Sequence, residues 1–411
     1  MKTIKIRPST VKGTIKINGS KNSALPIIVG ALLNNKKVKL KNIPDIKDIN
    51  ELIQIIEYLG ATIKRKRNTL KITPKIQNKE ILHESCKTFR ASYYLMGLYL
   101  ALFNHVKIYL PGGCNIGKRP IDFHLMGFEA LGAKYKITDN IIEIALIRPT
   151  NAKITLPKKS LGATINLILL ASRIEGLTTI NNISLEPELI DFVNFMKKMG
   201  LKIYIEGTSV YIYGKSYLNK KIKYKIIPDR IEASTFICLG LVTNKVKVKK
   251  ININHLNNIL LPLKQSKANI KITKNSVTTR KSRINGMKII SAEYPKLSTD
   301  IFPLLLPVMA YSKDACKITE TIYENRFEVC NELIKLGVNI EINNSDCLIT
   351  GNKETITNEV SATDLRCAAS LLIYAISTNK DIIIDNFNII ERGYENILKK
   401  LDILHVNYEV L

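Results

Sequence analysis

The sequence lacks tryptophan, and it has little negative charge and little arginine. Among its 411 residues, 62 Lys and Arg face 35 Asp and Glu, so the formal net charge is +27, and 13 of the basic residues are Arg. Long apolar runs are also missing, because the longest, 91–103 and 301–311, fall short of the ~18 residues that a membrane-spanning helix needs. Both runs are predicted to be buried core elements, and the 45% apolar content excludes a disordered chain.

The cysteines and histidines form no recognisable ligand or disulfide pattern. The seven cysteines are odd in number and contain no CxxC pair, and the five histidines are dispersed along the chain. Such spacing is typical of reduced thiols in the cytosol and offers no metal-ligand cluster. We therefore expect a cytoplasmic protein with no metal and no cofactor.

The excess of positive charge raises the question of a nucleic-acid partner. The lysines are spread over the whole chain, in strands such as 246–249 and in turns such as 64–67, and no long basic arm is present. This distribution favours solvated lysines that reflect composition, and the alternative is that part of them binds nucleic acid or a membrane. We expect a monomer with no nucleic-acid partner and no membrane partner. The first 19 residues alternate charged and β-branched side chains, so no signal peptide is expected.

A unit of nearly constant length recurs along the chain. An amphipathic helix ends at Leu-Gly or an equivalent pair and is followed by two alternating strands. The helix ends fall at residues 60, 132, 200, 268, 337 and 405, which are 68 to 72 residues apart. Each unit also holds another strand and helix, so it reads as βαβαββ. Six such units predict subdomains packed in two groups of three.

The most specific segment is Pro111-Gly112-Gly113-Cys114-Asn115-Ile116-Gly117-Lys118-Arg119-Pro120. It lies between a predicted strand and a helix that begins near Asp122, where backbone N–H groups favour an anion. The charges of Lys118 and Arg119 are expected to lower the pKa of the Cys114 thiol below its usual ~8.5. The loop therefore predicts a functional thiol.

Other candidate residues lie at predicted helix starts. Lys21 and Asn22 open a helix after a Gly-Ser pair, which suits a phosphate or carboxylate ligand. Taken alone, this segment favours the simpler interpretation of a capped helix with an exposed lysine. Among the arginines, Arg90 precedes an apolar helix, and a further three each sit beside an acidic residue at a predicted helix start: Arg326, Arg366 and Arg392. For each of these three, a structural ion pair and a grip on an anionic ligand are both open.

Asp300 precedes the apolar run from Ile301, and Ser298 or Thr299 is expected to cap that helix. The carboxylate would then lie in the first helical turn, where it favours the helix dipole. The sequence alone leaves two roles open for Asp300, a structural one and that of a general base.

The loop at 111–124 resembles that of the enolpyruvyl transferases, and within them the group that acts on UDP-N-acetylglucosamine. Other matching motifs follow in the same order over essentially the whole chain: Lys21-Asn22, Arg90-Ala91-Ser92, Ser160-Leu161-Gly162-Ala163-Thr164, Glu186-Pro187-Glu188, Pro228-Asp229-Arg230-Ile231-Glu232, Thr299-Asp300, Glu324-Asn325-Arg326-Phe327, Asp364-Leu365-Arg366 and Arg392-Gly393-Tyr394-Glu395. The six repeats agree with the resemblance independently.

The resemblance implies an α/β fold, a two-domain inside-out α/β barrel with three repeats in each domain. The first domain would span 21–228 and the second 1–20 plus 229–411. The implied reaction transfers the enolpyruvyl group of phosphoenolpyruvate to the 3′-hydroxyl of UDP-N-acetylglucosamine and releases phosphate. It is the first committed step of peptidoglycan precursor synthesis.

The same resemblance assigns roles to residues. Cys114 would protonate the methylene carbon, and Asp300 would take or orient the proton of the attacking hydroxyl; both would be catalytic, together with Lys21 and Arg392. The implied phosphoenolpyruvate ligands are Lys21, Asn22, Arg119 and Arg392. The implied UDP-N-acetylglucosamine contacts are Arg90, Arg119, Pro120, Ile121, Asp122, Phe123, Lys158, Lys159, Ser160, Leu161, Asp300 and Ile322. The supporting residues are His124, Arg230, Arg326, Asp364 and Arg366.

Two departures from the family pattern and three alternatives remain. The segment 295–299 lacks a Gly and a second Pro that the family usually has, and Tyr94 stands where many members carry Trp. One alternative is the enolpyruvyl transferase type acting on shikimate 3-phosphate, which lacks the cysteine loop. The others are a basic nucleic-acid-binding or RNA-end-processing protein on a related fold, and a non-catalytic copy.

Overall fold

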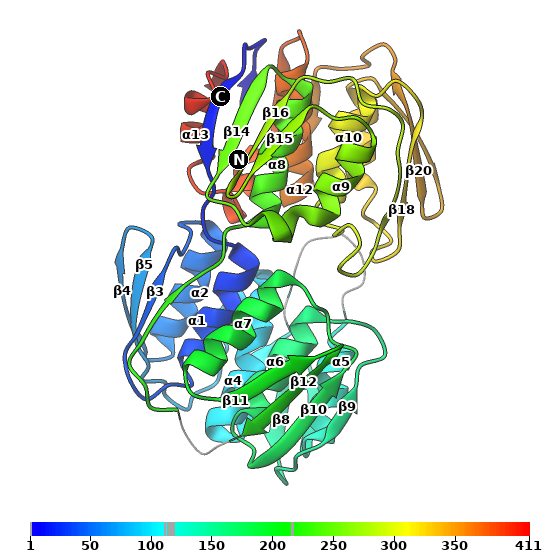
Figure 1. The fold of residues 1–411 in the computed structure, drawn as a ribbon. Helices are drawn as coiled ribbons and strands as arrows, with labels where there is room; N and C mark the ends of the chain where they lie inside the picture. Colours follow the sequence, from blue (N-terminus) through cyan, green and yellow to red (C-terminus); the bar gives the residue numbers. More distant parts are fainter. Residues whose placement is uncertain (1, 111, 113–119, 215–217) are drawn as a thin grey trace. The chain divides into compact units, whose positions relative to one another are not determined.

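The computed structural model describes residues 2–110, 112, 120–214 and 218–411. The described residues divide into two compact units (Figure 1). Unit 1 contains residues 2–18 and 228–411, and unit 2 contains the described residues between 19 and 227. Each unit has its own continuous hydrophobic core.

In each unit the helices form the centre and the sheets form the outside. Helix α12 (Leu365–Ser377) is buried at every position from Leu365 to Ile376, and α6 (Leu161–Ala171) is buried from Ala163 onward. A helix that is apolar on all sides must be enclosed by other elements. The strands instead alternate buried and more accessible residues, as in β8 (Ile141–Leu146), where buried and half-buried residues alternate, so one sheet face meets water. This arrangement is the expected inside-out α/β barrel.

Unit 2 has strands that pair in three sheets around packed helices. Its strands are β3 (Val38–Lys41), β4 (Thr62–Lys66), β5 (Thr69–Thr73), β6 (His105–Tyr109), β7 (Ala133–Thr138), β8, β9 (Lys153–Thr155), β10 (Gly176–Asn181), β11 (Lys202–Glu206), β12 (Ser209–Gly214) and β13 (Ile222–Lys225). Its helices are α1 (Lys21–Ala31), α2 (Lys47–Tyr58), α3 (Ser85–Thr88), η1 (Arg90–Tyr93), α4 (Tyr94–Phe103), α5 (Asp122–Ala130), α6 and α7 (Pro187–Lys198).

Unit 1 is built in the same way, with α8, α10 and α12 in contact with one another at its centre. Its strands are β1 (Ile4–Ile6), β2 (Lys12–Lys16), β14 (Lys245–Lys249), β15 (Ile270–Thr273), β16 (Ser276–Arg280), β17 (Lys288–Ser291), β18 (Cys316–Glu320), β19 (Val338–Asn343), β20 (Asp346–Asn352), β21 (Glu359–Ser361), β22 (Ile382–Asp385) and β23 (Tyr408–Val410). Its helices are α8 (Arg230–Val242), η2 (Ile253–Leu256), α9 (Asn257–Gln265), α10 (Phe302–Ala310), α11 (Glu328–Lys335), α12, η3 (Phe387–Arg392) and α13 (Ile397–Ile403).

The six repeats predicted from the sequence appear as six sheets among the described residues. The pattern β-α-β-α-β-β is complete in the third repeat, where β9, α6, β10, α7, β11 and β12 follow one another and the four strands share a sheet. In each repeat, a residue with positive φ follows the end of the second helix by two positions. These residues are Gly60, Gly132, Gly200, Lys267, Gly337 and His405. The fourth repeat therefore aligns at Lys267, one residue earlier than the sequence suggested.

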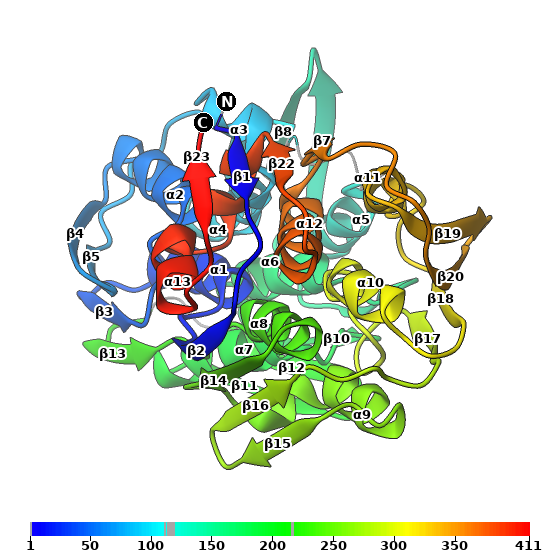
Figure 2. The same cartoon turned by 90° about the horizontal axis from the view of Figure 1, so that it is seen from above.

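Three strands pair with strands that are distant from them in the sequence. β2 lies parallel to β14, β13 lies parallel to β3, and β1 lies between β22 and β23, as Figure 2 shows for β1. The strands β2 and β13 are therefore exchanged between the first and fourth repeats. The first and last strands, β1 and β23, therefore lie in the same sheet of unit 1.

The structure corrects several local expectations. Lys64 and Lys66 lie on strand β4 instead of a turn. Asp300 lies in a turn before α10, which begins at Phe302, and Ser298 Oγ accepts the N–H of Asp300 at 3.4 Å without capping the helix. Arg392 ends η3 and does not start a helix. These differences arise because short turns precede or replace the helix ends that the apolar pattern indicated.

Six of the seven cysteines fall among the described residues, and all six are buried thiols. Two of them lie close together, with 3.7 Å between the Sγ atoms of Cys330 and Cys347. In the described part of the chain, no helix is long and apolar enough to cross a membrane.

The aligned helix ends yield a prediction about stability. Lys267 and His405 adopt φ values of 61° and 57°, where a side chain is disfavoured and glycine is not. We expect Lys267→Gly and His405→Gly each to raise the free energy of unfolding by up to about 1 kcal/mol. Gly200→Ala, at φ 98°, is the converse control and should lower it. Urea unfolding of the three variants measures both effects, and a loss of stability in both glycine variants would contradict the alignment.

Candidate active site

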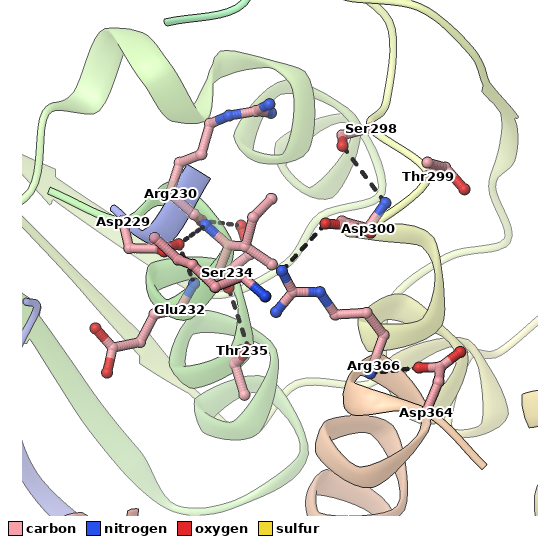
Figure 3. A network of polar contacts seen from close by, with 12 residues as sticks. Asp229, Arg230, Glu232, Ser234, Thr235, Ser298, Thr299, Asp300, Asp364 and Arg366 are labelled. Atoms are coloured by element: carbon pink, nitrogen blue, oxygen red, sulfur yellow. Dashed lines mark hydrogen bonds and ion pairs between the residues drawn. The ribbon is translucent and has the colours of Figure 1, made fainter. Parts of the chain in front are cut away.

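A pair of arginines holds the carboxylate of Asp300 in unit 1. Arg326 Nη2 donates to Asp300 Oδ1 at 2.9 Å, and Arg366 Nη2 donates to Asp300 Oδ2 at 3.1 Å, as drawn for Arg366 in Figure 3. Both arginine side chains are buried, whereas that of Asp300 is 28% exposed. Two buried cations therefore fix an accessible carboxylate at the start of α10.

The same arginines are held in turn by neighbouring groups. Arg326 Nε donates to the carbonyl oxygen of Thr299 at 3.0 Å, and its Nη1 lies 3.3 Å from Asp364 Oδ2. Asp364 caps α12, since its Oδ1 accepts the N–H groups of Arg366 and Cys367. The sequence left a structural ion pair and ligand binding open for Arg326 and Arg366, and the structure gives both an ion pair.

The charges of this cluster shift the pKa values of its members. Burial, the largest single effect, lowers the pKa of Arg366, but the charges of Asp300, Tyr394 and Asp229 together raise that pKa above its usual value. Burial raises the pKa of Tyr394 to about 12 against the opposing effect of Arg366. The Tyr394 hydroxyl lies 2.6 Å from Thr235 Oγ1 on α8 and 3.5 Å from Arg366 Nη1. Arg366 thus stays protonated and Tyr394 stays neutral at physiological pH.

The start of α8 carries a second charged group of unit 1. Asp229 caps the helix through the N–H groups of Ile231 and Glu232, and Arg230 lies over the ring of Tyr294 at 5.8 Å. Glu232 is buried, accepts the N–H of Asn18 at 3.0 Å and pairs with Lys400 of α13. These contacts position the helix start next to the point where the chain leaves unit 1.

In unit 2, Lys21 and Asn22 open helix α1 as predicted. Lys21 Nζ lies 3.0 Å from Asp48 Oδ2, and the Asp48 side chain is 5% exposed. Ser23, in the first turn of the helix, donates to the buried Asp191, which also accepts the Tyr224 hydroxyl at 2.6 Å. Asp48 therefore fixes the ammonium group of Lys21 at the end of α1 that favours anions.

A histidine cluster lies at the start of α5 in unit 2. Asn166 of α6 accepts the N–H of Gly97 through Oδ1, which fixes its amide, and its Nδ2 donates to His124 Nδ1 at 2.9 Å. His124 Nδ1 is then an acceptor, so Nε2 carries the ring proton. Burial, with a smaller effect from Arg90, lowers the pKa of His124 to about 3. The ring of Tyr93 meets that of His124 edge to face, with 5.0 Å between the centroids.

The predicted UDP-sugar contacts of unit 2 lie around this cluster. The guanidinium of Arg90 lies over the ring of Tyr93 at 5.7 Å, and Ser160 caps α6 by accepting the N–H of Ala163. A Cβ on Gly162 would lie 2.7 Å from the Tyr93 hydroxyl, so Tyr93 reaches the start of α6. The remaining predicted contacts precede or open α5 and α6 and are half-buried or exposed: Pro120, Ile121, Asp122, Phe123, Lys158, Lys159 and Leu161.

The other predicted residues are placed as follows. Ile322 lies in unit 1, where its N–H donates to Glu320 Oε1 at 2.7 Å. Arg392 is half-buried in unit 1. Cys114 and Arg119 lie outside the described residues. The structure therefore forms two separate groups of predicted site residues. One surrounds Asp300 in unit 1, and the other contains Arg90 and His124 in unit 2.

Sequence reasoning missed several residues that hold these groups. Asp48 and Asn166 were not singled out, although each is a buried polar residue on an otherwise apolar helix face. Asn166 interrupts the apolar run 161–171, and this interruption was the available signal. Lys400 carried no such signal, because its partner Glu232 lies 168 residues away in the sequence.

Among the described residues, no group of three or more His, Cys, Asp or Glu side chains is suited to hold a metal ion.

The comparison of the whole chain with known protein families defines the class of protein. The profile of the EPSP synthase (3-phosphoshikimate 1-carboxyvinyltransferase) family matches residues 6–401, and the chain belongs to this family.

Curated relatives carry a more specific name than that of the family. A UDP-N-acetylglucosamine 1-carboxyvinyltransferase of Halothermothrix orenii is 38% identical over 405 residues and covers 95% of both chains. The protein of that name from Buchnera aphidicola is 36% identical over 407 residues, with 98% of this chain and 97% of its own covered. These relatives confirm the resemblance that the sequence motifs indicated.

Solved structures support the fold. The enolpyruvyl transferase NikO from Streptomyces tendae matches with a TM-score of 0.90 at 21% identity and covers 100% of this chain and 99% of its own. EPSP synthase from Acinetobacter baumannii matches with a TM-score of 0.78 at 18% identity over the whole of both chains. The similarity to these solved structures therefore also confirms the inside-out barrel fold.

The neutral state of His124 predicts a pH dependence of stability. Between pH values of about 6.5 and 3 the unfolded chain binds a proton at this histidine and the folded chain does not. Stability should therefore fall as the pH drops below about 6.5, by up to about 1.4 kcal/mol per pH unit from this group. His124→Gln should have a flatter profile in urea unfolding between pH 4.5 and 7.5, roughly the range of this group. An NMR titration of the His124 ring near pH 6, its ordinary range, would contradict the assignment.

Proposed function

We propose that this chain transfers the enolpyruvyl group of phosphoenolpyruvate to the 3′-hydroxyl of UDP-N-acetylglucosamine and releases phosphate, the first committed step of peptidoglycan precursor synthesis. The observation that carries the proposal is the Asp300 carboxylate, fixed by Arg326 and Arg366 in a chain 35–38% identical to enzymes of that name over about 95% of its length.

The site chemistry supports this assignment. The two substrates carry a phosphate, a carboxylate and a diphosphate, and such charge needs cations that are already in place. In the proposal Lys21, Asn22, Arg119 and Arg392 bind phosphoenolpyruvate. The UDP-sugar contacts are those that the motifs imply, from Arg90 to Ile322. The ion pair with Asp48 holds Lys21 ready for the phosphate.

Asp300 is the proposed base. Its two oxygens accept from Arg326 and Arg366, which orient the carboxylate and stabilise its charge. In the reaction the hydroxyl oxygen of the sugar bonds to C2 of phosphoenolpyruvate while its proton passes to Asp300. The methylene carbon takes a proton from Cys114 and becomes a methyl carbon. Phosphate then leaves C2 and the methyl carbon returns a proton to Cys114, which restores the double bond and the thiol.

The proposal includes the physiological setting. The reaction requires the two small-molecule substrates, no macromolecular partner and no cofactor, and the enzyme acts as a monomer in the cytoplasm. The two domains are proposed to comprise 21–228 and 1–20 plus 229–411.

A second candidate is transfer to shikimate 3-phosphate, because the matching family profile carries the name of that activity. The Cys114 loop and the identities of 35–38% to the UDP-N-acetylglucosamine enzymes favour the first candidate. The two are separated by assaying phosphate release with each acceptor.

The direct test is phosphate release from phosphoenolpyruvate. We expect release with UDP-N-acetylglucosamine and none with shikimate 3-phosphate. Asp300→Asn keeps the shape of the side chain but cannot take a proton, so the turnover number should fall by roughly 10²–10⁴-fold.

Asp364→Asn is the matched control, because Asp364 contacts the same Arg326 and is not the proposed base. It should lose less than about tenfold. If phosphate is released with neither acceptor, the enzyme assignment is wrong. Equal losses of turnover in both variants would indicate that Asp300 has only a structural role.

The proposed role of Cys114 predicts selective alkylation. An epoxide analogue of phosphoenolpyruvate should modify Cys114, and faster with the UDP-sugar bound. The described thiols are poor competitors, since burial raises the pKa of Cys86 and of Cys367 to about 11 and thiolates are the reactive form. Peptide mass spectrometry locates the adduct, and uniform labelling of all seven cysteines would speak against an activated Cys114.

A further inference from the structure

Two sheets concentrate the excess positive charge on their outward faces. The first is the sheet of β13, β3, β5 and β4 in unit 2, which covers α1 and α2 in Figure 1. Strand alternation sends apolar residues such as Val38 and Leu40 inward and the neighbouring lysines outward. We call this outward surface the lysine face of unit 2.

The lysines of this face stand in rows across the strands. In one row four lysines from four strands are direct neighbours: Lys223, Lys39, Lys71 and Lys64. The adjacent row contains three more, with a threonine: Lys225, Lys41, Thr69 and Lys66. The remaining outward residues are Thr62 and Thr73, so the face carries seven lysines and no acidic residue.

The second sheet, of β2, β14, β16 and β15, has an equivalent surface in unit 1, which we call the basic face of unit 1. Its outward residues include three lysines of β14 and their cross-strand neighbours. The basic ones are Lys12, Lys16, Lys245, Lys247, Lys249, Lys271 and Arg280. Again no acidic residue points outward, and the others are Thr and Ser.

Composition alone does not explain these two faces. With 62 basic residues in 411, a face of ten residues would carry one or two. Three of the other four sheets pair an acidic residue with a basic one, as in Glu143 with Lys136 at 2.8 Å, Asp346 with Lys317 at 2.7 Å, and Glu409 with Arg7 at 2.6 Å. The clustering is thus a property of two particular sheets.

The clustered lysines repel one another. Like charges directly opposite on neighbouring strands destabilise a sheet, and no ion pair within the described ranges involves any of the fourteen basic residues. The charge of Lys223, with further effects from Lys39 and Lys225, lowers the pKa of Lys41. A polyanion laid over the face would remove this repulsion.

The side chains on the faces indicate which polyanion fits. Neither face presents an aromatic residue for stacking on nucleic-acid bases. Only one of the fourteen basic residues is Arg, the side chain that most often recognises a base through two hydrogen bonds. Neither presents an apolar side chain for insertion into a bilayer. Point charges in a two-dimensional array match a surface of phosphate headgroups, and clusters of 4–8 basic residues are typical of anionic-lipid binding.

We propose that the lysine face of unit 2 and the basic face of unit 1 dock the protein reversibly on an anionic phospholipid surface. The contact is electrostatic and peripheral. For these fourteen residues, the proposal replaces the expectation that the excess positive charge has no binding partner. It stands independently of the proposed reaction.

The test is co-sedimentation with lipid vesicles. Wild-type protein should bind vesicles of one-third phosphatidylglycerol and two-thirds phosphatidylcholine at about 0.15 M salt. Binding should vanish on pure phosphatidylcholine and at about 1 M salt, where the Debye length falls from about 8 to about 3 Å.

A six-lysine variant removes three charges from each face: Lys39→Gln, Lys71→Gln, Lys223→Gln, Lys245→Gln, Lys247→Gln and Lys249→Gln. Whichever face makes contact loses three lysines, so the partition coefficient should fall on the order of a hundredfold, at roughly fivefold per lysine. The matched control removes six outward lysines from sheets other than these two: Lys107→Gln, Lys134→Gln, Lys136→Gln, Lys153→Gln, Lys202→Gln and Lys288→Gln. It should change binding by less than about threefold.

The outcomes separate the alternatives. Equal losses in both variants would mean that only net charge matters and would overturn the proposal. Absence of wild-type binding to the anionic vesicles, or tighter binding to polyuridylate or duplex DNA at the same salt, would also overturn it. Phosphate release measured on the same variants should be unchanged, so a failure of docking is distinguishable from a failure of the enzyme assignment.

Discussion

The exchange of one strand between the first and fourth repeats is the constraint on which the rest of the fold depends. The sheet of β3 is completed by β13, and the sheet of β14 is completed by β2. Neither sheet can be built from one continuous stretch of chain. Lys21 follows one exchanged strand and Arg230 follows the other, so strand exchange places a candidate ligand and a candidate supporting residue shortly after a fixed backbone segment.

Buried carboxylates anchor the chain beside both exchanged strands. Glu232 accepts the N–H of Asn18 and pairs with Lys400 inside unit 1. In unit 2, Asp191 accepts the hydroxyls of Ser23 and Tyr224 and the N–H of Ile227. A buried carboxylate without such partners would be costly, so each of these groups is committed to one arrangement of the chain. The active-site candidates thus depend on polar contacts in the interior as well as on apolar packing.

The sequence alone was sufficient for the repeats and for the positions of most helices, because hydrophobic periodicity and glycine at positive φ are local signals. It also indicated Asp300, Arg326 and Arg366 as candidates. It did not indicate Asp48 or Asn166, because the identity of a cross-helix partner depends on packing between distant segments. The turn before α10 was likewise hidden, since a run of apolar residues does not reveal the residue at which its helix begins.

The position of β1 has a consequence for synthesis of the chain on the ribosome. Unit 2 lies between residues 19 and 227, so all of its strands have been made once residue 227 has emerged. Strand β1 must wait for its neighbours β22 and β23, whose residues are among the last to be made. At roughly 5–20 residues per second, the first strand of the protein remains unpaired for about 10 to 40 seconds after unit 2 is able to fold.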